Sequence, residues 1–256
     1  MPAVFLGHGS PMNAIEDGPI RRGWAEAAAR LPRPRAVLCV SAHWETRGVA
    51  VTGSASPPTI HDFGGFPRAL FEVQYPAPGD PELASEVARL LGESGVEARI
   101  DPSRGLDHGA WAVLIAMYPE ANVPVIQLSL DRGRSLAEHY ELAKALAPLR
   151  ESEVLIVGSG DIVHNLGLVD FGRAGGYDWA DRFDAEVAAR IEAADHDTLI
   201  HPERMGRDAA LSIPTAEHYA PLLYVLAQQR EGEPVSFFNT GVTLGSISMT
   251  SLIVGE

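Results

Sequence analysis

The sequence predicts a single α/β domain over residues 1–256, with three layers and a central mixed β-sheet flanked by helices. Three observations indicate this fold. Short apolar runs alternate along the chain with segments of helical periodicity, which is typical of helices packed on a largely parallel sheet. A length of 256 residues with 46% hydrophobic content is sufficient to bury one large core. The last two apolar runs are joined by a short glycine-containing segment, so part of the sheet is expected to be antiparallel.

The first third of the chain is expected to contain three strands and one helix. Residues 3–7 predict a strand that ends in a Gly-His-Gly-Ser-Pro turn, and residues 19–30 predict a helix with proline in its first turn. A second strand is expected at residues 35–41, with a short strand at residues 49–52 paired beside it. Residues 53–81 carry many Gly, Pro and aromatic residues without a helical period, and long irregular loops in compact domains usually have a function. We therefore expect this loop to cover a substrate.

The rest of the chain continues the alternation of helices and strands. Asp107 and Ser135 are expected to cap the helices that follow them, because their side chains can accept a hydrogen bond from the first helical turn. The expected helices are residues 81–92, 108–118, 135–149, 177–193, 202–210 and 218–229. The expected strands are residues 97–100, 123–130, 153–158, 234–239 and 246–253.

Composition narrows the classes of partner. The formal net charge is −14, whereas nucleic-acid-binding surfaces carry clustered Lys and Arg, so no nucleic-acid partner is expected. No apolar stretch approaches the roughly 18 residues of a membrane span, so no membrane partner is expected. The single cysteine, Cys39, lies in an apolar run and cannot form an intramolecular disulfide. These features indicate a cytoplasmic protein, and the oligomeric state stays open.

Four histidines that adjoin apolar runs predict a metal site. In open α/β sheets ligands bind at the carboxyl ends of the strands, so imidazoles that follow different strands can converge there. Each of these histidines alone is equally consistent with an ordinary core or surface residue, but together they match a site with about three protein ligands and an open position. They are His8, His43, His164 and His218. Solvated positions are expected instead for His139, His196 and His201.

Two further histidines have both an ordinary and a functional interpretation. His61, in IHDFGG, either pairs with the following aspartate to cap a turn or contacts a polar substrate. His108, in GLDHGAW, either simply begins a helix or donates a proton, with Asp107 orienting it. The Gly-x-Ser segments lack the pattern of a nucleophile elbow, and the turn GSGDIVHN lacks the lysine of a P-loop. A serine triad is therefore improbable, and the signal for phosphate binding is weak.

Six segments together resemble a known family. They are GHGSPMNAIEDGP, SAHWETRGVAVT, IHDFGGFPRALFEVQYPAPGDPELA, GLDHGAWAVL, VLIVGSGDIVHNL and AEHYAPLLYVL, in order over nearly the whole chain. The chain resembles the class III extradiol ring-cleaving dioxygenases, and within them the DOPA 4,5-dioxygenase branch of bacteria and plants. The combination of segments is specific, although each segment alone would not be.

The resemblance implies a mixed sheet flanked by helices with a mononuclear non-haem metal at one end. By position, His8, His43 and His218 correspond to the metal ligands. In the broader class the third ligand is a carboxylate, whereas here the match is His218, with Glu217 beside it. His164 corresponds to a histidine over the metal that is either an acid/base residue or, in zinc-bound forms, a further ligand.

The resemblance also implies the substrates and the pocket. Fe(II) would support insertion of O2 into a catechol such as DOPA, opening the ring to a muconic semialdehyde, and Zn(II) is the other metal that the site could bind. His108 would act with His164 in moving protons. The pocket positions are His61, Phe63, Phe66 and Tyr75, the last three as an apolar wall, and either Arg68 or Arg104 would bind a substrate carboxylate.

Two other classes of function remain open from the sequence. Four imidazoles also suit Zn(II), and a zinc-bound water of near-neutral pKa would make the protein a hydrolase. A non-catalytic binding or signalling protein on the same scaffold is the second alternative, because a fold does not fix a function. Retention of all four histidines argues against the second alternative.

Overall fold

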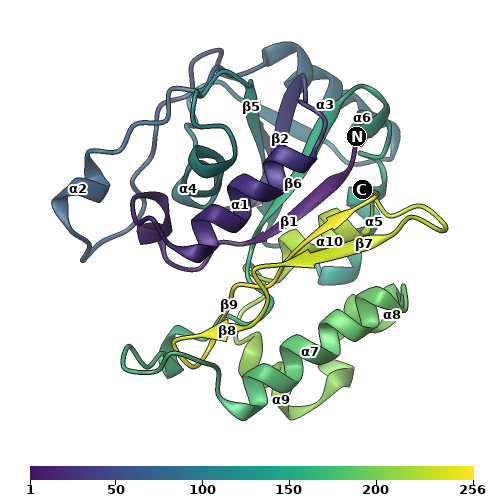
Figure 1. Ribbon diagram of the computed structural model, residues 1–256. Helices are drawn as coiled ribbons and strands as arrows, with labels where there is room; N and C mark the ends of the chain where they lie inside the picture. Colours follow the sequence, from purple (N-terminus) through teal and green to yellow (C-terminus); the bar gives the residue numbers. More distant parts are fainter.

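An eight-stranded mixed sheet runs through the centre of the computed structural model, which describes residues 1–256 (Figure 1). Its strand order is β4 (Ala98–Asp101), β3 (Val49–Thr52), β5 (Val125–Asp131), β2 (Ala36–Thr46), β6 (Val154–Gly160), β1 (Ala3–Gly7), β10 (Ser251–Val254) and β7 (Val235–Phe238). The four central strands β5, β2, β6 and β1 are parallel, and β10 is antiparallel to both of its neighbours. The predicted mixed sheet is confirmed.

The helices and a second, two-stranded sheet surround this centre. The α-helices are α1 (Pro19–Arg30), α2 (Arg68–Phe71), α3 (Pro81–Glu93), α4 (His108–Met117), α5 (Leu136–Lys144), α6 (Pro148–Glu151), α7 (Asp178–Glu192), α8 (His196–Leu199), α9 (Arg207–Ser212) and α10 (Ala220–Leu226). The 3-10 helices are η1 (Pro11–Ala14), η2 (Leu166–Leu168) and η3 (Pro202–Met205). The small sheet pairs β8 (Val242–Thr243) with β9 (Ile247–Ser248). Asp107 and Ser135 cap α4 and α5 as predicted.

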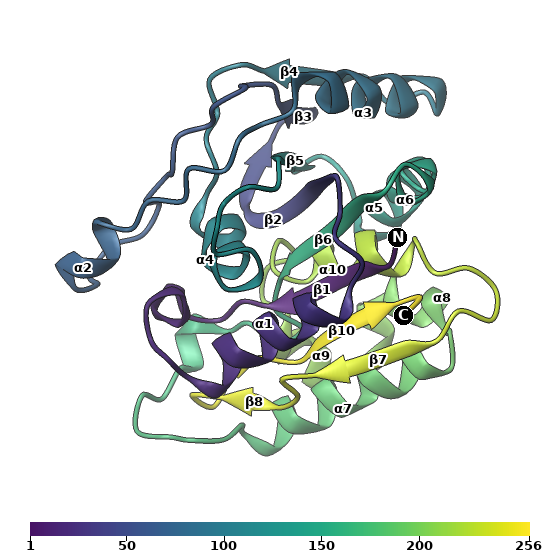
Figure 2. The ribbon, with the colours of Figure 1, turned by 45° about the horizontal axis from the view of Figure 1, so that its top comes forward.

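Side chains that alternate along the central strands build the two interfaces of a three-layer fold. In β1, Ala3 and Phe5 join a cluster of 39 buried residues that also contains the apolar faces of α3, α5, α7 and α10. Val4 and Leu6 point the other way, into a cluster of 28 buried residues with α1 and α4. Figures 1 and 2 show α1 and α4 together on one face of the sheet. Burial of both faces explains why the central strands read as continuous apolar runs.

Two predicted features of the strands are corrected. The strand predicted at residues 35–41 is longer, so His43 lies inside β2 and not after it. The pairing of β2 with β5 shifts register between Val40 and Glu45, and such a bulge can redirect a side chain away from the regular pleat. The strand at residues 49–52 forms, but it pairs with β4 and β5 and not with β2. Its partner was not readable from the sequence because the pairing is between segments far apart in the chain.

Several predicted helices are shorter or divided. The helix predicted at 135–149 ends at Lys144, and the separate helix α6 begins at Pro148, a residue that favours a first helical turn. The helix predicted at 202–210 divides at Gly206, whose φ of 80° is not helical. The last helix starts at Ala220, so His218 precedes it. The strand predicted at 246–253 divides into β9 and β10, and the short helix α8 had no sequence signal.

His139 is buried, which corrects the prediction of a solvated position. Its side chain is on the inner face of α5, where Nδ1 lies 2.9 Å from the hydroxyl of Tyr224. Among the other two histidines expected at the surface, His196 is half-buried between Tyr140 and Gln229, and His201 is half-exposed.

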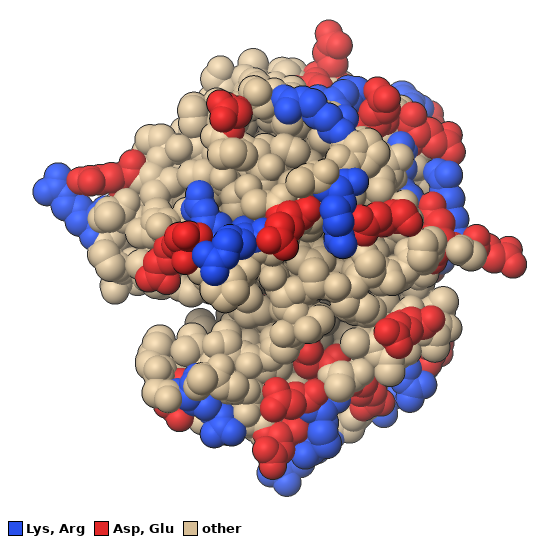
Figure 3. Space-filling view, viewed as in Figure 1, with Lys and Arg blue, Asp and Glu red and all other residues tan.

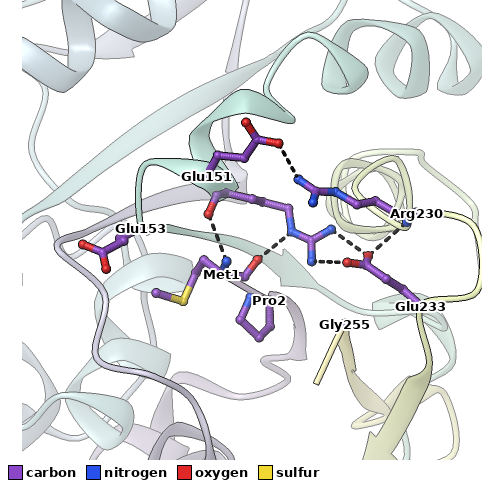
Figure 4. Close-up of a pocket in the computed structure, with 8 residues that line it drawn as sticks. Met1, Pro2, Glu151, Glu153, Arg230, Glu233 and Gly255 are labelled. Atoms are coloured by element: carbon purple, nitrogen blue, oxygen red, sulfur yellow. Dashed lines mark hydrogen bonds and ion pairs between the residues drawn. The ribbon is translucent and has the colours of Figure 1, made fainter.

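A buried arginine anchors the amino end of β1. Arg150 donates to the carbonyl of Met1 and forms two hydrogen bonds, of 2.8 and 2.9 Å, with the carboxylate of Glu233. The amino group of Met1 donates in turn to the carbonyl of Arg150 at 2.9 Å. Figure 4 shows Met1, Glu233 and Arg230 around this pocket. The contacts fix the start of the central strand at the end of the sheet opposite to the histidines.

The surface carries mixed charge on the face drawn in Figure 3, with no extended basic patch there. The same view shows a furrow that separates the part bearing α7, α8 and α9 from the rest of the molecule. None of the helices combines the length and the apolar character that crossing a bilayer requires.

The buried His139 should make the metal-free protein less stable in mild acid. Burial lowers the pKa of His139 to about 4, whereas the unfolded chain titrates near about 6.5. The unfolded state therefore binds more protons between these values, so stability falls as the pH falls through this window. The contribution is roughly 2 kcal/mol between pH 7 and pH 5. Urea unfolding of His139→Gln should show a pH dependence smaller by about this amount.

A matched variant separates burial from hydrogen bonding. Tyr224→Phe removes the hydroxyl that His139 contacts but leaves the imidazole buried, so it should keep the pH dependence of the wild type. An unchanged pH dependence in His139→Gln would contradict the assignment.

Candidate metal centre

The parallel strands bring the predicted histidines to one edge of the sheet. β2, β6 and β1 are adjacent; His43 lies near the carboxyl end of β2, and His164 and His8 follow the carboxyl ends of β6 and β1. His218 reaches the same place because its backbone carbonyl accepts a hydrogen bond from Asp161, at the end of β6, at 2.8 Å. One ligand atom each from His8, His43 and His218 lies within 4.8 Å of the others. The structure thus brings these residues together from four separate parts of the chain.

Two glycines permit this close approach. A Cβ atom at Gly160 would overlap the carbonyl of His218, so only glycine lets β6 end against that segment. A Cβ atom at Gly109, in the first turn of α4, would overlap Ser41 and lie 2.9 Å from the ring of His43. Both positions therefore have to lack a side chain if the imidazoles are to converge.

The tautomer of His8 is fixed by a serine on β6. Ser159 Oγ lies 2.5 Å from the carbonyl of Gly109 and uses its only hydrogen there. It must therefore accept the hydrogen bond from His8 Nδ1, which lies 3.0 Å away. Burial, and then the nearby imidazole of His43, lower the pKa of His8, so the ring is neutral and Nε2 carries a lone pair.

His8 and His43 face each other at the spacing of two ligands of one ion. Their Nε2 atoms are 3.3 Å apart. Two nitrogens bound to one ion at 2.0–2.1 Å in tetrahedral geometry lie roughly 3.3–3.4 Å apart. Burial and the neighbouring imidazole of His108 also lower the pKa of His43. Both rings are therefore neutral at neutral pH.

His218 presents a third imidazole nitrogen to the cluster. Its Nδ1 donates to Glu217 Oε1 at 3.0 Å, and its buried Nε2 has no hydrogen-bond partner. Although burial raises the pKa of Glu217, hydrogen bonds from His218 and Thr215 lower it to about 2, so this side chain is a carboxylate. Glu217, which the sequence placed beside a ligand position, thus orients an imidazole in the manner common around protein-bound metals.

His164 lies against His218 and next to a buried carboxyl group. The rings of His164 and His218 are stacked, with centroids 3.4 Å apart and an interplanar angle of 6°. Burial, followed by the proximity of His218, lowers the pKa of His164 to about 3. One ligand atom each from Asp161, His164 and His218 lies within 4.8 Å of the others. Asp161 has no distinguishing signal in the sequence, although it lies three residues before His164.

His108 is oriented by Asp62 and not by Asp107. Asp62 Oδ1 accepts hydrogen bonds from the backbone N–H of His108 at 3.0 Å and from Nδ1 at 2.9 Å. Asp107 instead accepts from Ser41 and Gln127 inside the core. The expected orienting residue is therefore corrected, because the residue next in sequence caps the helix while a residue from the long loop reaches the ring.

The loop predicted to cover a substrate supplies an aromatic group beside His108. Phe63 lies edge-on to His108, with ring centroids 5.4 Å apart. His61 donates from Nε2 to the carbonyl of Val73 at 2.9 Å, so its ring is held within the loop. The aromatic group consists of His61, Phe63, Phe66, Phe71 and Trp111. Phe71 and Trp111 had no signal in the sequence beyond being apolar.

Three predicted pocket residues lie at different depths. Tyr75 is fully buried and donates its hydroxyl to the carbonyl of Tyr118, so it packs in the core. Arg68 lies on α2, which projects from the body in Figures 1 and 2; its side chain is 91% exposed and pairs with Glu72. Arg104 is closer to the histidines, because its guanidinium lies 3.5 Å from the carbonyl of His43.

The donor set fits a transition-metal ion. The imidazoles of His8 and His218 have one nitrogen engaged by a neighbouring side chain, and the other faces the cluster as a lone pair. His218 Nε2 and Asp161 Oδ2 are buried without any hydrogen-bond partner. Buried polar atoms are rarely left unsatisfied, and a cation would satisfy both.

Comparisons with known proteins agree with the geometry. The family described as the catalytic LigB subunit of aromatic ring-opening dioxygenase matches residues 2–232. A protein of Escherichia coli (strain K12) named 4,5-DOPA dioxygenase extradiol is 45% identical, over 100% of this chain and 95% of that protein. A Beta vulgaris protein of the same name is 36% identical, over 96% of each chain. A crystal structure of an uncharacterized protein from Escherichia coli K12 matches with a TM-score of 0.87 and 39% identity, covering 100% of both chains.

Loss of the Ser159 hydroxyl should weaken metal binding. In Ser159→Ala the Nδ1 atom of His8 loses its acceptor, so the proton can move to Nε2 and block the lone pair. Zn(II) affinity, measured at neutral pH against a chromophoric chelator, should fall by about 10–100-fold. Ser129→Ala is the matched control, because that buried serine bonds only to the β2–β3 region. Equal affinities in Ser159→Ala and the wild type would show that the serine does not set the tautomer.

Proposed function

Since the chain belongs to the LigB family of aromatic ring-opening dioxygenases and is an extradiol ring-cleaving dioxygenase, we propose that it uses Fe(II) held by His8, His43 and His218. The observation that carries this proposal is the convergence of three imidazoles: the Nε2 atoms of His8 and His43 lie 3.3 Å apart, and the buried Nε2 of His218 has no hydrogen-bond partner. Three protein ligands leave positions for substrate and oxygen. A catechol with an amino-acid side chain, such as DOPA, is the proposed substrate, because the relatives are named for it.

In the proposed reaction both atoms of O2 enter a catechol and the ring opens to a muconic semialdehyde. When bound, Fe(II) supplies Lewis acidity toward the two catechol oxygens and the one-electron chemistry that oxygen needs. The protein has to orient the ring, move protons and exclude water, and each of these tasks has a residue in place.

His164 is the proposed proton acceptor for the catechol hydroxyl. Its ring lies 3.4 Å from that of His218, so it borders the site where the diol would bind. A general base must be within hydrogen-bond reach of the proton that it removes, and a neutral imidazole meets the chemical requirement. The same residue could serve as a further ligand when Zn(II) occupies the site, as the sequence analysis anticipated.

His108 is the proposed partner of the substrate oxygen on the opposite side. Its ring centroid lies 3.8 Å from that of His43 and 6.3 Å from that of His8. Asp62 holds Nδ1, which leaves Nε2 for an oxygen of the substrate or of the opening ring. The proton that His164 takes up can return to the product through either imidazole.

The aromatic group from the long loop and α4 is the proposed wall for the catechol ring. Phe63 and Trp111 lie next to His108 and His61, so an aromatic ring bound there meets apolar faces and edges. This wall would also keep water away from the reacting atoms. For the substrate carboxylate we favour Arg104 over Arg68, because Arg104 lies near His43 whereas Arg68 extends into solvent.

Metal-dependent oxygen uptake tests the proposed metal and substrate. The metal-free protein, loaded anaerobically with Fe(II), should consume one O2 per L-DOPA and form a yellow semialdehyde once oxygen is admitted. Zn(II) should bind without supporting uptake, because it has no redox chemistry. His43→Ala should abolish uptake, whereas His139→Gln, which changes a buried imidazole outside the site, should keep it. Uptake that is equal with both metals, or that survives in His43→Ala, would refute the proposal.

The two arginines make different predictions for substrate binding. Arg104→Ala should raise the KM for L-DOPA about tenfold more than the KM for unsubstituted catechol, because only the former carries a carboxylate. Arg68→Ala should change the two KM values equally and little. Steady-state kinetics on both substrates decides between them, and the reverse pattern would assign the carboxylate to Arg68.

A further inference from the structure

A buried carboxyl group lies inside the histidine cluster. Asp161 follows β6 directly and is 1% exposed. Its Oδ1 accepts a hydrogen bond from the backbone N–H of Gly9 at 3.0 Å. Its Oδ2 is buried and has no hydrogen-bond partner.

The unpartnered oxygen faces a nitrogen that cannot donate to it. Asp161 Oδ2 lies 3.5 Å from His8 Nε2. Because His8 Nδ1 carries the ring hydrogen and gives it to Ser159, His8 Nε2 has only a lone pair. An oxygen lone pair and a nitrogen lone pair therefore point at each other, and such an arrangement is favourable only with a proton or a metal cation between or beside them; burial, which raises the pKa of Asp161, favours the proton when no cation is bound.

No basic side chain compensates Asp161. Its one ionic contact is with His8, a ring whose buried position favours the neutral form. Burial of an unpaired carboxylate is costly, so buried carboxylates are normally hydrogen-bonded, paired with a cation or bound to a metal. Asp184 is a useful contrast, because its two oxygens accept hydrogen bonds from Ser248 and Thr250.

We propose that Asp161 is a ligand of the metal ion and supplies, through Oδ2, the anionic oxygen donor that the three imidazoles lack. The inference rests on the proposed metal site of the dioxygenase. Two ligands bound at 2.0–2.2 Å to one ion at 90–110° lie roughly 2.8–3.6 Å apart, and the 3.5 Å between Asp161 Oδ2 and His8 Nε2 is near the upper end of this range. One carboxylate oxygen of Asp161 also lies within 4.8 Å of a ring nitrogen of His164 and of a ring nitrogen of His218.

A carboxylate at this point changes what the site prefers to bind. Three neutral imidazoles leave the full charge of a divalent ion uncompensated, whereas one carboxylate removes half of it inside a region of low dielectric. Imidazole combined with carboxylate is also the donor set of non-haem Fe(II) oxygenases. Asp161 thus provides the carboxylate from the end of β6, and Glu217, the carboxylate next to His218 in sequence, is engaged in orienting that ring.

The test uses Zn(II) affinity and the visible spectrum of bound Co(II), neither of which depends on turnover. Asp161→Asn keeps the shape but removes the charge, so Zn(II) affinity should fall by at least about tenfold and the Co(II) ligand-field bands should shift. Asp184→Asn, a buried aspartate outside the cluster, should change neither. Circular dichroism of each variant confirms that it is folded.

A second variant gives a positive signal. Asp161→Cys places a thiol on the same side of the cluster, about one bond short of Oδ2, and a thiolate bound to Co(II) produces a charge-transfer band in the near ultraviolet. The wild type is the control for Cys39, which is buried within β2, and it should show no such band.

The outcomes separate this inference from the proposed function. An Asp161→Asn protein with the wild-type Co(II) spectrum and an Asp161→Cys protein without the charge-transfer band would overturn the assignment of Asp161, while metal binding by the wild type would leave the dioxygenase site intact. A wild type that binds neither ion would overturn both. A shifted spectrum in Asp161→Asn together with the band in Asp161→Cys would support the ligand.

Discussion

The site depends on holding several buried imidazoles in fixed orientations. Three rings have one nitrogen held by a neighbouring side chain: Ser159 holds His8, Glu217 holds His218 and Asp62 holds His108. Such partners fix the tautomer, so the second nitrogen turns its lone pair inward. Without them the rings could rotate or exchange tautomers, and a buried unpaired nitrogen would only destabilise the fold. A cation is the natural complement of this arrangement.

The sheet sets the positions that these contacts refine. β2, β6 and β1 are neighbours, parallel and buried on both faces, so their carboxyl ends form one rigid edge. Arg150 fixes the other end of β1 through its contacts with Met1 and Glu233. The long loop with α2 projects on that side in Figures 1 and 2. The strands thus hold the proposed metal ligands while a loop holds most of the proposed aromatic wall.

Local sequence signals succeeded where the structure is local. The apolar run before His8 and the cap of α4 at Asp107 depend on neighbours within a few residues, and both were predicted. His139 was wrongly expected at the surface because the charged residues around it in sequence occupy the opposite face of α5. Asp161 drew no prediction, since nothing in a lone aspartate after a strand shows that its oxygen will face His8.

By itself the sequence determined the fold class, the strand ends that carry histidines and the loop that carries aromatics, because periodicity, turn residues and composition act over short stretches of chain. Only the tertiary structure decided which side chains share the site. In the folded protein Asp62 accepts a hydrogen bond from His108, and Tyr75 packs in the core. Arg104 lies nearer to the histidines than Arg68 does. These positions depend on contacts between segments that are far apart in the sequence. Asp62 and His108, for example, are 46 residues apart. Strand order and bulges fix these contacts, and no local pattern encodes them.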